Sequence, residues 1–403
     1  MKNKCFGCGK KIFKIIEICK TPPCDLFLRN KKKFKFYSLD LMFCKKCFLI
    51  RTKDIVKPSE IYSKYLYKTS HSSGLKDHFR KYSLDIKKKL KLKKNSYILD
   101  IGCNDGTFLE FFKKMNFKTL GVDPANNIKK DCEKKGIKIF NKFFDTNLAN
   151  KILNNYSINL VTANNVIANI PRINNFFSNV NKVLQPDGYF VFETIYGPQI
   201  IEKKLIDMIN NEHIYYFSFL ALKKILHNNG FEIINYKISK SKGGSIRIFS
   251  KKNKNINITR NFLVEKKEIK SGFNDFKKLK KLNKLYKNFK INFIKKFNKL
   301  SFRYNKIDCY GASAGSTSLI FFFKIFNKVN CIYDDNKLRH NLYLPGTKLK
   351  VQNSGDIKKK RPKLIIVLAW RYIDKILKRN KKIFKNNITV YNILPNLKKI
   401  NIK

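Results

Sequence analysis

The stretch between residues 97 and 112 constrains the fold of this chain more than any other. An apolar run ends at Asp100, glycines follow at Gly102 and Gly106, and apolar residues then recur at helical spacing from Phe108 onwards. That order predicts a strand, a tight glycine turn and a helix. Such a turn lets a ligand lie against the backbone at the N-terminus of the helix.

A second short strand, residues 119–122, is expected to end at Asp123, whose carboxylate can accept hydrogen bonds from two ribose hydroxyls. The turn reads Gly-Cys-Asn-Asp-Gly and lacks the Gly-x-Gly-x-x-Gly of dinucleotide-binding folds. Asp100, the single wide glycine spacing and Asp123 together resemble the S-adenosylmethionine (SAM) site of class I methyltransferases. The alternative is a generic Rossmann-like unit that binds no SAM.

The formal net charge of the chain is +59, which on its own favours a nucleic acid or an anionic surface as partner. The lysines are, however, spread along the whole chain, and their enrichment together with Asn, Ile and Phe is what A/T-rich codons produce. No aromatic-interleaved basic module appears either. We therefore expect a basic surface that attracts a small anionic substrate, and no nucleic acid. The sequence leaves the oligomeric state open, a monomer included.

Two C-x-x-C motifs, Cys5 with Cys8 and Cys44 with Cys47, are separated by about 35 residues. Four thiolates in two such pairs form a tetrahedral cage suited to zinc. Because sulfur would fill all four positions, we expect a structural zinc; a redox role for either motif is the alternative. Glycines at positions 7 and 9 free the first motif to turn, and the second motif has no such glycine.

The first cysteines follow the N-terminus directly, and the apolar run 364–370 is too short to span a bilayer. We therefore expect a cytoplasmic protein that does not enter a membrane. In that reducing compartment the ten cysteines are expected to be metal ligands or packed thiols. Cys19 and Cys24 could serve as alternative ligands, but we interpret them as structural.

Several polar side chains follow expected strands and should face one crevice, since ligands bind at the carboxyl ends of the strands of an open sheet. Asn164 and Asn165 follow a strand at 159–163, and Glu193 and Tyr196 lie at the carboxyl end of a strand at 189–193. A segment dense in hydroxyls, residues 62–73, could line a polar pocket or simply begin a helix.

The segment 210–218 carries the strongest candidate for proton transfer. His213 is the side chain that best accepts a proton near neutral pH, and the adjacent Glu212 can orient it. A structural histidine in a turn is the alternative. Further on, Arg247 follows two glycines in a strand and suits an anion such as a phosphate, or else lies on the surface.

Residues 259–300 are rich in lysine with apolar residues at helical spacing, which predicts one or two amphipathic linker helices, or a basic nucleic-acid-binding helix as the alternative. The α/β pattern then restarts. A strand at 307–310 enters a glycine turn at 311–317, a second strand ends at Asp334, and a third, 364–369, precedes Trp370. This predicts a second, smaller nucleotide-binding-like unit whose turn could hold a diphosphate.

With these motifs in order, the chain resembles the three-domain sugar C-methyltransferases. The matching stretches are the two cysteine pairs with YSLDLMFCKKC, YLYKTSHSS, LDIGCNDG, ANNVIANIP, NEHIYYFS, KGGSIR, YGASAGS, YLPGT and LAWRY. The resemblance implies an α/β fold: a class I SAM-methyltransferase Rossmann-like sheet, flanked by a small zinc-binding domain and a C-terminal Rossmann-like domain. The expected boundaries are 1–75 for the zinc-binding domain, 76–255 for the SAM domain, 256–300 for a helical linker and 301–403 for the substrate domain.

The resemblance also implies an activity: methylation of a ring carbon next to the ketone of a nucleotide-linked 4-keto-deoxysugar, typically C3. A carbon acid of this kind needs a base and donors that stabilise the enolate. By resemblance His213 is the base, Glu212 its neighbour and Tyr67 a hydroxyl facing the sugar. The expected SAM residues are Asp100, Gly102, Asn104, Gly106, Asp123 and Asn164. The expected substrate residues are Asn165, Tyr196, Lys242, Arg247, Gly311, Ser313, Trp370 and Arg371. An O- or N-methyltransferase on another small molecule, or a basic zinc-containing RNA-binding protein, is the competing interpretation.

The chain departs from the family pattern at a few positions. Asn210 and Asn211 stand where many members have Tyr and His, so a tyrosine often assigned to enolate or proton handling is missing. Asn169, Lys242 and Gly315 replace a histidine, a histidine and a lysine that are common in the family. The scaffold and the base persist, while the substrate and the methylated position come into doubt.

Overall fold

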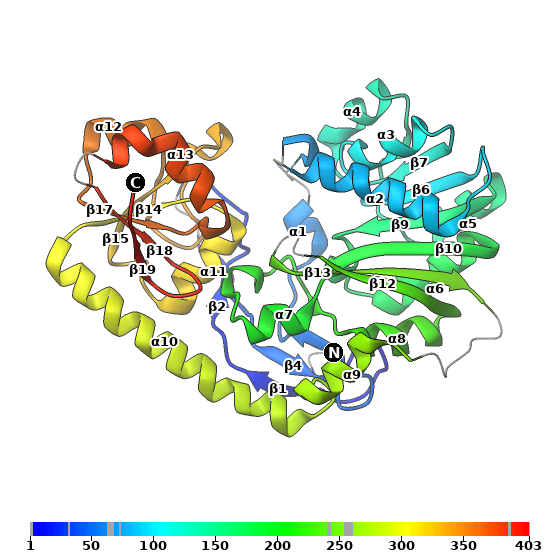
Figure 1. Cartoon of the computed structure of the whole chain (residues 1–403), viewed down its shortest axis with the longest axis horizontal. Helices are drawn as coiled ribbons and strands as arrows, with labels where there is room; N and C mark the ends of the chain where they lie inside the picture. The colour runs from blue at the N-terminus through cyan, green and yellow to red at the C-terminus, as the bar shows by residue number, and fades with distance from the viewer. Residues whose placement is uncertain are drawn as a thin grey trace.

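A computed structural model describes residues 3–30, 33–62, 68–71, 74–239, 243–253, 261–385 and 388–402. Within these residues the chain forms a large central sheet, a separate C-terminal sheet and a small N-terminal sheet. The N-terminal strands lie at the base, between the two larger units, and the long helix α10 (Phe276–Tyr304) runs along one side toward the C-terminal unit (Figure 1).

The central sheet has the strand order β12-β13-β10-β9-β6-β7-β8 among the described residues. Its strands are β6 (Tyr97–Ile101), β7 (Lys118–Val122), β8 (Lys138–Phe140), β9 (Ile158–Asn164), β10 (Leu184–Ile195), β12 (Phe231–Ser239) and β13 (Ser245–Lys252). Strands β8, β7, β6, β9 and β10 are parallel, and β13 and β12 add antiparallel pairings at one edge. Parallel strands covered on both faces read as continuous apolar runs, which is why the sequence revealed them.

Helices cover both faces of this sheet (Figure 1). They are α2 (Leu75–Leu90), α3 (Thr107–Lys113), α4 (Lys129–Lys134), α5 (Thr146–Asn155), α6 (Ile173–Val183) and α8 (Phe219–Asn228). Side chains before the first turn cap two of them. Asp145 accepts from the N–H of Leu148 at α5, and Ser218 accepts from the N–H of Ala221 at α8.

The N-terminal sheet contains a strand from far along the chain. Strands β1 (Phe13–Ile16), β4 (Leu41–Phe43) and β5 (Ile50–Thr52) pair in sequence, and β11 (Tyr215–Tyr216) then pairs with β5. A separate pair joins β2 (Lys20–Thr21) to β3 (Tyr37–Ser38). The segment that follows His213 is thus part of the sheet of the N-terminal domain.

Two amphipathic helices, α9 (Leu263–Ser271) and α10, follow the central sheet, as the apolar spacing predicted. Asp275 caps α10 by accepting from the N–H groups of Lys277 and Lys278. One end of α10 packs on the N-terminal strands through Phe276 against Phe13, and its other half stacks Phe293 on Phe323 of the C-terminal unit. The apolar face of α10 therefore joins these two units.

The C-terminal sheet has the order β16-β15-β14-β17-β18-β19 among the described residues. Its strands are β14 (Ile307–Tyr310), β15 (Val329–Asp334), β16 (Val351–Asn353), β17 (Leu364–Val367), β18 (Thr389–Asn392) and β19 (Lys398–Ile400), and its helices are α11 (Ala314–Phe323), α12 (Ile357–Lys360) and α13 (Ile373–Phe384). All strands but β19 pair in parallel. Strands β15 and β16 lie on one side of β14, and β17 and β18 lie on the other. The predicted Rossmann-like unit is therefore confirmed. No helix in the described part of the chain is long and apolar enough to cross a membrane.

Candidate active site

The glycine turn after β6 has the conformation that its sequence predicts. Gly102 and Gly106 both have φ angles of 73°, in the left-handed region that favours glycine. A Cβ atom on Gly102 would lie 2.2 Å from Cγ2 of Val166, so a side chain does not fit there. The N–H of Asn104 donates to the Asp123 carboxylate at 3.0 Å, which ties the turn to the end of β7. Val166 and Asp123 therefore hold the turn in place.

A cavity of about 210 Å³ lies at the carboxyl ends of β6, β7 and β9. Gly106 lies behind its wall and packs against Ile137 and Cys132. The other residues predicted to hold the cofactor all line the cavity: Asp100, Gly102, Asn104, Asp123 and Asn164. Apolar side chains complete the wall, among them Phe79, Phe108, Val122, Phe143 and Ile170.

Two carboxylates give this cavity its electrostatic character. Burial raises the pKa of Asp100 to about 7, although Thr162 donates to its carboxylate at 2.6 Å. Burial also raises the pKa of Asp123, while the N–H groups of Ala125 and Asn104 work against that rise. SAM brings a positive charge and a ribose diol, so a buried carboxylate at one strand end and a second at the next suit it.

The Asn164 amide is a second indication that a polar ligand binds here. Its Nδ2 and Oδ1 atoms are both buried and have no hydrogen-bond partner among the described residues, and the same holds for Oδ1 of Asn165. Asn165 has a φ angle of 58°, and its N–H donates to the Glu193 carbonyl at 2.7 Å. Buried polar atoms are normally paired, so these amides are available to a ligand with both donors and acceptors, and SAM fits that requirement.

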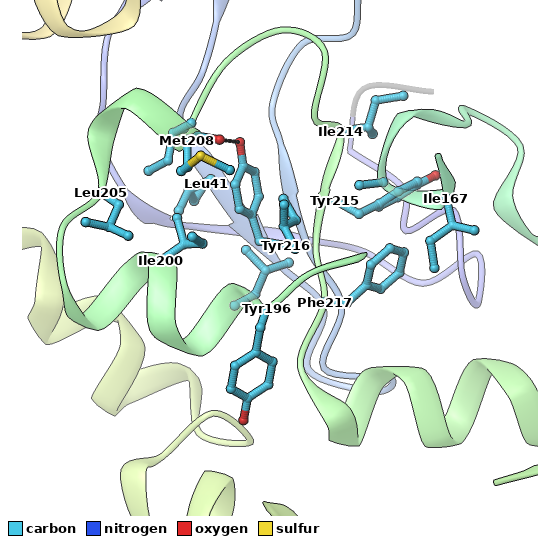
Figure 2. Packing of buried hydrophobic residues seen from close by; sticks show 14 of the residues in the cluster. Leu41, Ile167, Tyr196, Ile200, Leu205, Met208, Ile214, Tyr215, Tyr216 and Phe217 are labelled. Carbon is cyan, nitrogen blue, oxygen red and sulfur yellow. Dashed lines mark hydrogen bonds between the residues drawn. The ribbon is translucent and has the colours of Figure 1, made fainter. Parts of the chain in front are cut away.

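The loop that carries His213 adjoins the rim of this cavity. The N–H of Ile214 donates to the Ala168 carbonyl at 2.7 Å, in the short helix η3 (Ile167–Asn169) that ends in the cavity-lining Asn169. Nδ1 of His213 lies 3.0 Å from the Met208 carbonyl oxygen. The Tyr216 hydroxyl donates to the same oxygen at 3.2 Å (Figure 2).

Residues of the N-terminal domain fix the neighbouring asparagine. Thr21 donates to the Oδ1 atom of Asn211 at 2.8 Å, and the Cys24 thiol donates to it at 2.9 Å. The Thr317 hydroxyl of α11 in turn donates to the Cys24 carbonyl. Asn210 turns inward and accepts from the N–H of Glu212 at 3.0 Å. All three units of the chain therefore meet at the His213 loop.

Two predicted substrate residues have partners inside the protein and do not line the cavity. The Tyr196 hydroxyl donates to Glu268 at 2.7 Å, and its ring points away from Met208 and Tyr216 (Figure 2). The Arg247 guanidinium donates to Glu193 through Nε and Nη2, at 3.1 and 2.8 Å, and is only 4% exposed. The position of Arg247 follows from strand pairing, since Glu193 and Arg247 are directly opposite each other in β10 and β13.

Sequence reasoning missed the buried ionic network around Glu193. His78 of α2 lies 2.9 Å from this carboxylate, and the Arg247 guanidinium lies over the ring of Tyr82. Burial alone would raise the pKa of Glu193, but the hydrogen bond from His78 and the charge of Arg247 hold it below its usual value. The alternation of polar and apolar residues in the strands could not reveal this network, because it depends on which strands pair.

The C-terminal unit contributes a glycine turn with a φ angle of 99° at Gly311, where a Cβ atom would lie 2.4 Å from Cβ of Ala369. Ser313 caps α11 with a reciprocal hydrogen bond to Ser316. A Cβ atom on Gly315 would lie 2.6 Å from the Asp207 carbonyl oxygen, which leaves no room for the lysine common in the family. This turn therefore abuts η4 (Ile206–Met208), which leads into the His213 loop.

Trp370 and Arg371 reach the same acidic residue. Trp370 donates from Nε1 to the Asp207 carboxylate at 3.1 Å, and Arg371 donates from Nη1 at 2.5 Å. Burial raises the pKa of Asp207, and the guanidinium works against that rise. No motif in the sequence pointed to a role for Asp207. Tyr67 and Lys242 lie outside the described residues.

The four predicted zinc ligands converge in the N-terminal domain. The Sγ atoms of Cys5, Cys8, Cys44 and Cys47 all lie within 4.8 Å of one another. Cys5 and Cys47 are 3.4 Å apart, as are Cys8 and Cys44, close to the roughly 3.8 Å sulfur separation of a tetrahedral zinc–thiolate site. The donor set fits zinc, and all ten cysteines are unbridged thiols.

Each cysteine pair is followed by one residue in the left-handed region. Gly9 has a φ angle of 71°, as its sequence suggested, and Phe48 takes the equivalent place after Cys47 with a φ angle of 63°. The Phe48 ring stacks on Phe43, and the Lys224 ammonium lies 3.9 Å from its centroid. Packing thus allows a conformation that the first pair reaches with glycine.

Three domain-family models match consecutive stretches of the chain. A zinc binding domain matches residues 5–62, a methyltransferase domain residues 75–236 and a C-methyltransferase C-terminal domain residues 240–395. The chain is also similar to the C-methyltransferase NovU of Streptomyces niveus, with 23% identity over 354 residues, 87% of this chain and 84% of that protein.

Solved structures align with part of the chain. A SAM-dependent methyltransferase from Archaeoglobus fulgidus is 21% identical, covers 43% of this chain and 94% of its own, and has a TM-score of 0.35. A second, from Clostridium acetobutylicum, is 15% identical, covers 46% of this chain and 94% of its own, and has a TM-score of 0.36.

Proposed function

The chain belongs to the three-domain C-methyltransferase family, and we propose that it methylates a ring carbon next to the ketone of a nucleotide-linked 4-keto-deoxysugar, with C3 as the methylated position. As a SAM-dependent methyltransferase it uses SAM, which supplies an electrophilic methyl group. The sugar, its nucleotide and the position are the parts that we propose.

Methyl transfer to carbon requires removal of a proton from a carbon acid, and His213 is the proposed base. Because Nδ1 of His213 donates to the Met208 carbonyl, Nε2 is the basic nitrogen in this tautomer. Glu212 is the adjacent acidic residue. Asn210 cannot replace the family tyrosine as a proton donor, because a side-chain amide does not release a proton near neutral pH; its Oδ1 atom accepts from the N–H of Glu212.

Hydrogen-bond donors that face the enolate oxygen must then stabilise it. The proposed donors are the Tyr67 hydroxyl, by resemblance, and the Asn165 side chain, which lines the cavity. The residues proposed to hold SAM are Asp100, Gly102, Asn104, Asp123 and Asn164. The two carboxyl groups suit that cation, and the buried amide atoms of Asn164 are available to its polar groups.

One observation carries this proposal: the loop of His213 contacts the cofactor cavity on one side and the C-terminal unit on the other. Ile214 bonds to Ala168 at the cavity rim, while Asp207 contacts Gly315, Trp370 and Arg371. A substrate with a small reactive ring and a long anionic nucleotide matches that arrangement. Its ring would lie near His213 and its nucleotide on the C-terminal sheet, near Gly311 and Ser313.

The test is an incubation of the protein with methyl-labelled SAM and a panel of nucleotide-linked 4-keto-6-deoxysugars, followed by mass spectrometry and NMR of the product. We expect one methyl group on the carbon next to the ketone. A methyl group on oxygen or nitrogen would instead identify an O- or N-methyltransferase.

A further inference from the structure

Arg371 has one side of its guanidinium occupied and the other side without a partner. Nη1 donates to the Asp207 carboxylate, whereas Nε and Nη2 are buried and have no hydrogen-bond partner among the described residues. Nε and Nη2 form the side-on edge that binds two oxygens of a phosphate or carboxylate at once. A buried guanidinium edge without an acceptor is costly, so this edge is suited to an anion.

The position of Arg371 in the fold is also that of a ligand site. It lies in the short helix η8 (Trp370–Tyr372) just after β17, and Gly311 lies just after β14. In this sheet β15 and β16 extend to one side of β14, and β17 and β18 extend to the other. Ligands of open parallel sheets bind at such a switch point, outside the carboxyl ends of the strands.

The surroundings hold Arg371 in place for such a ligand. The Trp370 ring lies 4.8 Å from the guanidinium carbon, and the indole N–H donates to the same Asp207 oxygen. Gly243 packs against this edge: a Cβ atom there would lie 2.9 Å from Nη2, so a residue with a side chain would crowd the guanidinium. The Arg371 side chain as a whole is 26% exposed, while Nε and Nη2 themselves are buried.

We propose that the Nε and Nη2 edge of Arg371 binds the diphosphate of the substrate, with Asp207 and Trp370 as positioning residues. The inference rests on the proposed function, since a nucleotide-linked sugar carries that diphosphate. Asp207 directly precedes Met208, the residue whose carbonyl oxygen holds His213. The anion site and the base are therefore attached to the same short helix, η4.

The test measures binding of ADP, GDP, UDP, dTDP and inorganic pyrophosphate, and of the corresponding nucleosides, to the full chain by calorimetry. In Arg371→Gln we expect about 10- to 100-fold weaker binding of the preferred nucleoside diphosphate, and of pyrophosphate, with nucleoside binding unchanged. Arg371→Lys should recover only part of the affinity, because an ammonium lacks the two-pronged edge. Arg379→Gln is the matched control, since Arg379 pairs with Asp335 on the exposed surface of the same unit.

SAM affinity is measured for every variant and should not change, which shows that the central domain is folded. Equal binding of the diphosphate by wild type and Arg371→Gln would overturn the inference and leave the proposed function standing. Equal losses of affinity for diphosphates and nucleosides would also overturn it, because Arg371 would then act on the fold or on the nucleoside part of the ligand. Absence of nucleoside diphosphate and pyrophosphate binding in the wild type would count against the proposed function itself.

Discussion

The Nδ1 atom of His213 lies 3.0 Å from the main-chain carbonyl oxygen of Met208. A carbonyl oxygen can only accept, so this contact requires a proton on Nδ1 and assigns the basic lone pair to Nε2. Tyr216 donates to the same oxygen from strand β11, which pairs with the N-terminal sheet. The proposed base is thus oriented by backbone that two domains hold in place.

Replacing His213 by alanine should lower turnover strongly while SAM still binds. A positioned general base contributes about 100- to 10,000-fold to a rate, so we expect a loss in that range. Single-turnover methyl transfer and SAM calorimetry measure the two quantities. The control is His227→Ala, in the last turn of α8. Normal turnover in His213→Ala would remove this residue from the mechanism.

Asn164→Ala should weaken SAM binding by about 2- to 10-fold, the usual worth of a neutral hydrogen bond. The reason is that both polar atoms of the Asn164 side chain are buried at the cavity without a protein partner. Asn155→Ala is the control, because that amide is exposed and donates to the Lys151 carbonyl. An unchanged SAM affinity in Asn164→Ala would show that the amide does not face the cofactor.

Gly102→Ala should lose SAM binding. The added methyl group would lie 2.2 Å from Val166, and alanine is strained at a φ angle of 73°. Gly355→Ala is the control, since its Cβ atom would make only an ordinary contact with Asn353. Calorimetry and the melting temperature are the measurements. SAM binding of wild-type strength in Gly102→Ala would contradict the described turn.

Cys44→Ser should lose the zinc and, with it, most of the turnover. Cys47 leads through Phe48 and Leu49 directly into β5, whose partner strand β11 lies just after His213. We therefore expect kcat to fall more than SAM affinity. Metal content per chain by mass spectrometry is the direct readout, and Cys19→Ser should keep one zinc. Stoichiometric zinc in a folded Cys44→Ser protein would refute the four-cysteine site.

The stability of the chain should depend on Asp100 between about pH 4 and pH 7. Burial raises its pKa to about 7, whereas a carboxyl in the unfolded chain titrates near 3.9. The native state therefore keeps a proton that the unfolded state has lost. The contribution to stability is full below about pH 4 and disappears as pH rises through about 7. The free energy of unfolding, measured by denaturant, should fall with pH across this range more steeply in the wild type than in Asp100→Asn. The same dependence on pH in both proteins would show that Asp100 ionises normally.

The sequence was most informative where a structure is set locally. Residue spacing over short stretches predicts the strand, glycine turn and helix at 97–112, the cysteine pairs and the amphipathic helix α10. The structure contains all of these features. The carboxyl ends of parallel strands share one edge, so the cavity-lining Asp100, Asp123 and Asn164 could be named in advance.

Sequence reasoning was least informative where strand register and domain packing decide. Arg247 was expected to meet a substrate anion; its pairing opposite Glu193 also gives it an internal partner that the sequence did not reveal, and its substrate role stays a prediction. The same holds for Tyr196, whose hydroxyl donates to Glu268 of the later helix α9. The contact of Asp207 with Arg371 joins residues 164 positions apart, beyond any local pattern.

The most direct test of the proposed chemistry is hydrogen exchange at the substrate carbon. The protein is incubated with nucleotide-linked 4-keto-6-deoxysugars in deuterated water, with and without SAM, beside a protein-free control and His213→Ala. We predict enzyme-dependent deuterium on the carbon next to the ketone, a methyl group on that carbon when SAM is present, and neither signal with His213→Ala. Methyl transfer without any exchange at that carbon, or exchange that His213→Ala retains in full, would contradict the account.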